Sequence, residues 1–138
     1  MRIVGFDVGR RRIGVAISDS TRTLARPVGV LTVADAGAAV AAAVQEVARF
    51  AAEEDGVYAV VVGLPRRLDG TPNDMTAVVE HFATRLRAGV SVPVFMQDER
   101  LSSREAESRL AVRDKDWRSR KSRLDAAAAA VILQDYLD

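Results

Sequence analysis

The sequence predicts an α/β protein with a mixed five-stranded sheet, made of three antiparallel strands followed by two parallel ones and flanked by helices. Two observations carry this prediction. Three short apolar runs open the chain, as in consecutive hairpins. Beyond them, segments with the apolar period of a helix alternate with single apolar runs, as in right-handed crossovers that add parallel strands to a sheet.

The five predicted strands are residues 2–8, 13–18, 28–33, 58–62 and 92–97. The fourth is uniformly apolar, which is typical of a central parallel strand buried on both faces. The fifth contains a proline near its start, which an edge strand tolerates.

The segments with helix signals are residues 36–54, a segment from residue 72, residues 102–112 and residues 122–137. Asp35 is the expected N-cap of the first, Thr71 with Pro72 should open the second, and Ser102 begins the third. The basic segment 113–123 lacks an apolar period and is predicted to be a loop. The order of strands and helices is that of an RNase H-like fold, and we expect one domain over residues 1–138.

Composition excludes several kinds of site. The chain has 138 residues and no cysteine, so disulfides, thiolate zinc sites and a cysteine nucleophile are excluded. The one histidine, His81, is expected on a helix surface without a catalytic part. No window approaches the ~18 consecutive apolar residues of a membrane span, so we expect a cytoplasmic protein. Net charge is only +1, so any binding of nucleic acid must depend on where the basic residues lie.

Asp7 lies near the end of the first, otherwise apolar strand. Burial of an unpaired carboxylate there would cost several kcal/mol unless a cation or hydrogen-bond donors meet it. The alternative is a turn aspartate whose carboxylate accepts from the backbone amides of residues 9–11.

Glu99 follows the fifth strand, whose carboxyl end shares an edge of the sheet with the end of the first strand if the two are parallel. With one strand between them, the two backbones would lie ~10 Å apart, a gap that carboxylate side chains could close around one or two ions. The alternative is that residues 98–100 form a solvated loop with a local ion pair.

Asp125 shares a helical face with apolar residues that should pack on the sheet, among them Ala128 and Ile132. An acid on such a face favours a functional role. Ser122 and Asp125 are also spaced as a capping pair, so Asp125 could instead satisfy the start of the helix, and the two roles could coexist.

Asp7, Glu99 and Asp125 together would form an oxygen-only site, which suits Mg²⁺ or Mn²⁺ and does not suit zinc. Two such ions about 3.5–4 Å apart could activate water and stabilise the leaving oxygen in phosphodiester cleavage. We therefore expect these three acids to be the catalytic and metal-binding residues of a nuclease that uses one or two ions.

Basic residues cluster in the segments that follow the predicted strands and precede the last helix. The residues expected to bind phosphates are Arg10, Arg11, Arg12, Arg66, Arg67, Arg100, Arg120, Lys121 and Arg123. Such contacts set affinity and salt sensitivity more than sequence choice. The alternative for any one of them is an ordinary solvated side chain. Trp117 could stack on a base or pack beneath its own segment.

Four motifs occur in order along the chain. They are Gly5-Phe6-Asp7-Val8-Gly9 leading into Arg12-Ile13-Gly14-Val15-Ala16, Val62-Gly63-Leu64-Pro65 with Asp69-Gly70-Thr71, Asp98-Glu99-Arg100-Leu101-Ser102, and Asp125-Ala126-Ala127. In this order and spacing the chain resembles the YqgF/RuvX family over nearly its whole length. The resemblance implies an RNase H-like fold and a carboxylate metal site with Asp7, Glu99 and Asp125 at the acidic positions. Arg10 departs from the family pattern, in which a small hydroxyl residue usually follows the Asp-x-Gly.

The resemblance implies two activities, 5′-end processing of pre-16S ribosomal RNA, which we favour, and resolution of Holliday junctions. Symmetrical cutting of a four-way junction would need a two-fold homodimer. A nucleic-acid-binding factor of ribosome assembly without catalysis would share the arginines but would not need the three acids to meet. The first loop also resembles the phosphate-binding loops of actin-like and sugar-kinase-like ATPases, whose members carry two such domains.

Overall fold

The computed structural model describes residues 1–99 and 117–138, and for residues 117–123 it describes the backbone alone. Five strands form one sheet in the order β3-β2-β1-β4-β5. They are β1 (Arg2–Val8), β2 (Arg12–Ser18), β3 (Ala25–Thr32), β4 (Val57–Leu64) and β5 (Val94–Asp98). β2 is antiparallel to β1 and β3, whereas β4 is parallel to β1 and β5. The predicted mixed sheet is confirmed, with β5 at its edge.

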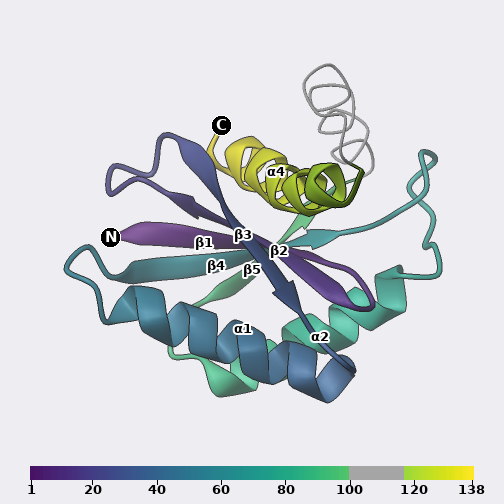
Figure 1. Cartoon of the computed structure of the whole chain (residues 1–138), viewed down its shortest axis with the longest axis horizontal. Helices are drawn as coiled ribbons and strands as arrows, with labels where there is room; N and C mark the ends of the chain where they lie inside the picture. Colours follow the sequence, from purple (N-terminus) through teal and green to yellow (C-terminus); the bar gives the residue numbers. More distant parts are fainter. Residues whose placement is uncertain (100–116) are drawn as a thin grey trace.

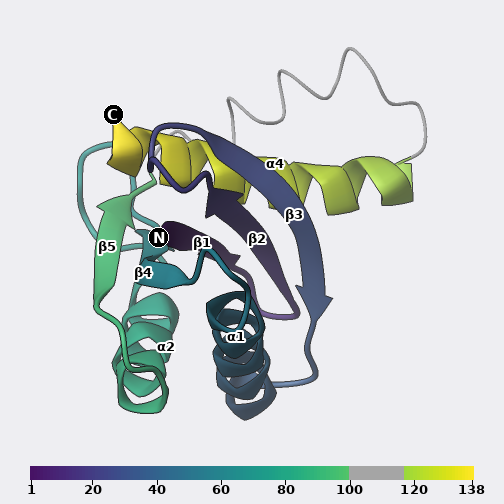
Figure 2. The same cartoon turned by 90° about the vertical axis from the view of Figure 1, so that its left-hand side faces the viewer.

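Helices cover both faces of the sheet (Figures 1 and 2). α1 (Ala36–Ala51) and α2 (Thr76–Gly89) lie on one face and α4 (Trp117–Leu137) lies on the other. β4 contributes to both layers of the core, because Val60 and Val62 pack on the side of α1 and α2, while Ala59 and Val61 pack on the side of α4. This two-sided burial explains its uniformly apolar sequence.

The predicted cap of α1 is confirmed, and the predicted start of α2 is wrong. Asp35 accepts a hydrogen bond from the N–H of Ala38 at 2.8 Å. α2 begins at Thr76 and not at residues 71–72. The N–H and hydroxyl of Thr71 donate to Asp69 Oδ1 in a turn, at 2.9 and 2.7 Å. The side chain of Asn73 instead accepts from the N–H of Thr76 at 3.1 Å, so the local turn outcompetes the expected cap.

The last helix begins earlier than predicted. The backbone of α4 is helical from Trp117, so residues 117–123 do not form the expected loop. Ser122 and Asp125 both lie inside the helix and cannot form the capping pair at its start. Arg, Lys and Ser carry little penalty in a helix, and extending a helix that is already packed adds a hydrogen bond for each residue fixed. The predicted helix 102–112 lies outside the described residues.

α4 lies almost directly on the backbone of the sheet because glycines face it. A Cβ atom at Gly14 of β2 would come 2.0 Å from the carbonyl oxygen of Asp125. A Cβ atom at Gly63 of β4 would come 2.6 Å from Ile132 Cδ1. The backbone of α4 thus comes very close to Gly14. Among residues 1–99 and 117–138, no helix is long and apolar enough to cross a bilayer.

Gly14→Ala should therefore destabilise the fold, since the added methyl group overlaps the backbone of α4. We expect the free energy of unfolding, measured by urea denaturation followed by circular dichroism, to fall by roughly 1–3 kcal/mol. Gly29→Ala in β3 is the matched control, because a Cβ atom there meets nothing within 4 Å. Equal losses in the two variants would contradict the proposed contact.

Candidate active site

Three acids from three elements lie at one edge of the sheet. Asp7 is the penultimate residue of β1, Glu99 directly follows β5, and Asp125 lies in α4. β1, β4 and β5 are parallel, so their carboxyl ends share this edge. The N–H of Glu99 donates to the carbonyl oxygen of Leu64 at 3.2 Å, which continues the pairing of β5 with β4. β4 separates the other two strands, as the predicted spacing required.

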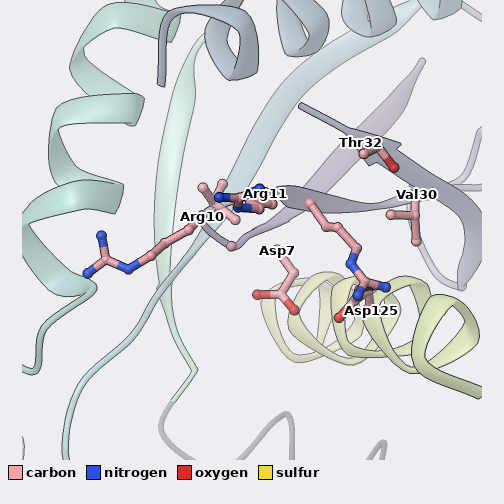
Figure 3. Close-up of a pocket in the computed structure, with 9 residues that line it drawn as sticks. Asp7, Arg10, Arg11, Val30, Thr32 and Asp125 are labelled. Carbon is pink, nitrogen blue, oxygen red and sulfur yellow. Dashed lines mark ion pairs between the residues drawn. The ribbon is translucent and has the colours of Figure 1, made fainter. Parts of the chain in front are cut away.

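The carboxyl group of Asp7 interacts with both other acids. It shares a side-chain hydrogen bond with Glu99, and it experiences the charge of Asp125. Figure 3 shows the side chains of Asp7 and Asp125 facing the same cleft, one from the end of β1 and the other from α4. The structure thus brings the three sequence-predicted acids together.

Gly14 explains why Asp125 reaches this position. In the register of β1 with β2, Gly14 is the direct partner of Asp7. The backbone of Asp125 lies over Gly14 in the space that a side chain would fill. An acid inside α4 is thereby brought beside an acid on a strand.

Gly63 makes room for Glu99 in a similar way. A Cβ atom at Gly63 would lie 2.9 Å from Glu99 Oε2 and 2.6 Å from Ile132 Cδ1, so these two side chains fill the space above the glycine. Glu99 Oε2 is buried and has no hydrogen-bond partner among the described residues. The alternative of a solvated loop at Glu99 is therefore wrong.

Burial raises the pKa of both carboxyl groups of the pair. The pKa of Asp7 rises to about 6 because burial, and to a lesser extent the charge of Asp125, outweigh the hydrogen bond from Glu99. The pKa of Glu99 rises to about 9 because of its burial, the charge of Asp7, the hydrogen bond to Asp7 and the charge of Asp98. Near neutral pH the pair therefore holds one proton, carried by Glu99 and donated to Asp7.

The chemistry of the three acids suits a hard divalent cation. All their donors are carboxylate oxygens, one of which is buried and unsatisfied, and their charges repel one another. In their present rotamers, no group of three or more Asp, Glu, His or Cys side chains within residues 1–99 and 117–138 has the geometry of a metal site. The shared proton now relieves part of the repulsion that a cation would relieve.

Asp7 and Asp125 line a cleft of about 800 Å³ together with the loop of Arg10, Arg11 and Arg12. Arg12 Nη1 lies 3.7 Å from Asp125 Oδ2, and both side chains are about one-third exposed. Figure 3 shows the side chain of Arg10 pointing away from Asp7. Arg12 thus contacts Asp125, whereas Arg10 extends to another surface.

The opposite wall of the cleft comes from β3 and was missed in the sequence. Val30 and Thr32 line it. They are the register partners of Gly14 and Arg12 in the pairing of β2 with β3. The signal that could have found them is this pairing, since it carries β3 past the glycine and the arginine of β2.

The loop between β1 and β2 bears on two alternatives, the turn aspartate and the ATPase-like phosphate loop. The N–H of Gly9 donates to the carbonyl oxygen of Arg12 at 2.7 Å. That amide is therefore not available to cap Asp7 as a turn aspartate, nor to bind the phosphate of a nucleotide in the manner of an ATPase loop.

Arg66 and Arg67 lie in the segment that leaves β4 beside Glu99. Arg66 forms an isolated bridge with Pro72, and the N–H of Gly70 donates to the carbonyl oxygen of Arg67 at 2.8 Å. Gly70 has φ +87°, a left-handed conformation that favours glycine, and with this hydrogen bond it closes a turn. The two arginines thus stand on a structured turn at the acidic edge.

The remaining predicted basic residues are described only in part. Arg100 lies outside the described residues. Arg120, Lys121 and Arg123 lie within α4, so the prediction of a loop is wrong for them. The structure describes only the backbone of these three residues and of Trp117.

The raised pKa values of Asp7 and Glu99 make stability depend on pH when no metal is present. A group whose pKa is raised by folding stabilises the fold below its unfolded pKa and loses that contribution as pH rises through its folded value. Here the window extends from about pH 4 to about pH 9. In the presence of a metal chelator, we expect the free energy of unfolding to fall by roughly 1–3 kcal/mol as the pH rises across this window.

Asp7→Asn should flatten this pH profile, which thermal denaturation at several pH values would measure. Asp19→Asn is the control, because hydrogen bonds from Thr21, Thr23 and Leu24 lower the pKa of Asp19 to about 2, and its contribution changes only in acid. A wild-type profile that rises between pH 5 and 9 would contradict the assignment of a buried carboxyl pair.

Comparison with solved structures identifies the fold. The chain aligns with "T. thermophilus RuvC in complex with Holliday junction substrate" at a TM-score of 0.55 and 17% sequence identity, over 96% of this chain and 91% of that one. The predicted RNase H-like fold is confirmed by this likeness.

Comparison with known sequences identifies the family. A protein of Anaeromyxobacter dehalogenans strain 2CP-C named "Putative pre-16S rRNA nuclease" is 48% identical over 139 residues, which cover all of this chain and 97% of that protein. A relative of the same name from Chloroflexus aurantiacus is 42% identical over 99% of this chain and 86% of its own length. The family model described as "RuvX: Holliday junction resolvase" matches residues 1–138. The chain therefore belongs to the RuvX family.

Proposed function

We propose that this chain is a cytoplasmic, metal-dependent nuclease that hydrolyses phosphodiester bonds in the 5′-end processing of pre-16S ribosomal RNA. The meeting of Asp7, Glu99 and Asp125 at one edge of the sheet carries this proposal. Relatives with up to 48% identity that bear the name of a pre-16S rRNA nuclease favour RNA as the substrate.

Asp7, Glu99 and Asp125 would hold one or two Mg²⁺ or Mn²⁺ ions, which supply Lewis-acid activation of the phosphodiester and stabilise its leaving oxygen. A carboxylate must be deprotonated to bind a metal, so the proton that Glu99 donates to Asp7 would leave on binding. Arg12 orients Asp125 from 3.7 Å, and the exposed Arg11 lines the cleft where a phosphate backbone would lie.

Resolution of Holliday junctions is the second candidate, because the family model carries that description. Cutting a four-way junction requires two symmetrical sites and therefore a homodimer. A role in ribosome assembly without catalysis is the third candidate. It is less well supported, since binding alone gives no reason for a carboxyl oxygen of Glu99 to be buried without a partner among residues 1–99 and 117–138.

The substrate is a 5′-labelled RNA that spans the pre-16S 5′ end. In the presence of Mn²⁺, Asp7→Asn should lower the rate of its cleavage by more than about 100-fold, because the buried pair loses the charge of one metal ligand. Gel electrophoresis of the products measures this. Asp138→Asn at the far end of α4 is the matched control and should cleave like wild type.

A synthetic four-way DNA junction belongs in the same experiment. If the wild-type protein cleaves the junction and not the RNA, resolution of Holliday junctions replaces RNA processing as the proposed function. Cleavage of either substrate at an undiminished rate by Asp7→Asn would overturn the active-site assignment.

The basic residues in the segment that leaves β4 predict a salt effect. Arg66→Ala combined with Arg67→Ala should weaken RNA binding and reduce the slope of log K against log salt concentration by about 1–1.4, since each phosphate contact on a single strand contributes ~0.7. Fluorescence anisotropy between 50 and 200 mM salt would measure this. Arg49→Ala on α1 is the control, because Arg49 is paired with Glu46 and lies over the ring of Phe50. An unchanged slope in the double variant would remove these arginines from the binding surface.

A further inference from the structure

A second cavity lies between α1 and α2, on the far side of the loop from the carboxylate cleft. Its volume is about 280 Å³. Its floor is apolar and is formed by Val8, Ala39, Val40, Val78 and Phe82. A cavity of this size is slightly below the range of pockets for drug-sized ligands, so it suits one compact group.

The rim of this cavity is basic. Arg10, His81 and Arg85 line it, and all three are exposed. Arg85 projects toward α1, since its Nη2 lies 3.9 Å from the position of a Cβ atom at Gly37. None of the described residues that line the cavity is acidic. The cavity therefore combines an apolar floor with a rim that attracts anions.

The cavity adjoins the carboxylate cleft across the loop between β1 and β2. Val8, Gly9 and Arg10 line both of them. Figure 3 shows Arg10 turned away from Asp7 and toward the helices, so its guanidinium group does not compete for the three acids. An anionic chain that lies in the cleft would meet Arg10 as it leaves Asp7.

We propose that this cavity is a nucleotide subsite, in which one unstacked base of the substrate enters the apolar floor while an adjacent phosphate binds Arg10 and Arg85. This inference rests on the proposed function, because the substrate is taken to be a nucleic acid. A simple anion would not need the apolar floor, and an apolar ligand would not need the basic rim. A nucleotide supplies both a flat base and a phosphate, and unpaired bases are commonly recognised in this way.

The subsite gives Arg10 a role that the carboxylate cleft does not. A small hydroxyl side chain at this position could not reach the space between α1 and α2. Arg10 can, so this chain extends its phosphate-binding surface from the acids to the cavity. Arg10 and Arg85 then act as binding residues that position the substrate, outside the group of catalytic acids.

Proton NMR of the imidazole of His81 provides a direct test, because it is the one histidine of the chain and lines the cavity. The probes are AMP, adenosine and inorganic phosphate, each added to the metal-free full-length protein at fixed pH. We expect AMP to shift the His81 resonance with saturation, and adenosine and phosphate each to bind at least about 10-fold more weakly, since each makes only part of the contacts.

Variants locate the site. Arg85→Ala should weaken AMP binding about 10-fold, through loss of a charge-assisted contact, and Val78→Phe should block it by filling the cavity. Arg26→Ala, an exposed arginine of β3, is the matched control and should leave AMP binding unchanged. Arg85 is exposed, so its variant tests the proposal even if Val78→Phe does not fold.

Three outcomes would overturn the subsite: no shift with AMP, equal affinity for phosphate and AMP, or equal losses in Arg85→Ala and Arg26→Ala. The assay needs neither metal nor cleavage, so it can fail independently of the proposed function. Saturable AMP binding in a protein that cleaves neither RNA nor junction would support the subsite and remove the nuclease assignment. Cleavage that depends on Asp7 in a protein that does not bind AMP would support the nuclease assignment and remove the subsite.

Discussion

The contact between α4 and the backbone of the sheet determines the geometry of the acidic edge. Without a side chain at Gly14, the backbone of Asp125 can lie across the partner residue of Asp7. Apolar burial holds the helix there, since Ile132 and Leu133 are fully buried and each contributes about 1.5–3 kcal/mol. The acids are therefore held together by packing that they do not themselves provide, against their own repulsion.

Positive charge at this edge would stabilise the three acids, and more than one cation can supply it. A proton shared by Asp7 and Glu99 relieves the repulsion in part, and the Arg12 guanidinium, at 3.7 Å from Asp125, relieves it further. Neither relieves the repulsion fully. With the proton in place, Glu99 Oε2 still has no hydrogen-bond partner among the described residues. The ion pair of Arg12 with Asp125 is partly exposed to solvent, which weakens it. A divalent ion would satisfy the same oxygens at once, which is the physical reason to expect metal binding here.

The sequence was sufficient for the sheet and for the edge at which the acids meet, because strand periodicity and the rule for parallel strands do not depend on detail. It was insufficient where local signals compete. Thr71 carries the pattern of a helix cap, yet Asp69 captures it in a turn. Residues 117–123 lack an apolar period, yet continue a helix whose later residues are packed. The hydrogen bond of Asp7 with Glu99 depends on space above Gly63, which only the three-dimensional packing reveals.

The loop between β1 and β2 separates the three acids from the proposed nucleotide subsite. Its arginines point in different directions, with Arg12 at the acids and Arg10 at the space between α1 and α2. A strand bound on both sides of this loop would have to bend around it and release a base from its stack. Duplex nucleic acid resists this, whereas a single strand or a branch point has bases that are already unpaired and costs least to deform. The shape of the loop therefore favours substrates with unpaired nucleotides next to the bond that is cut.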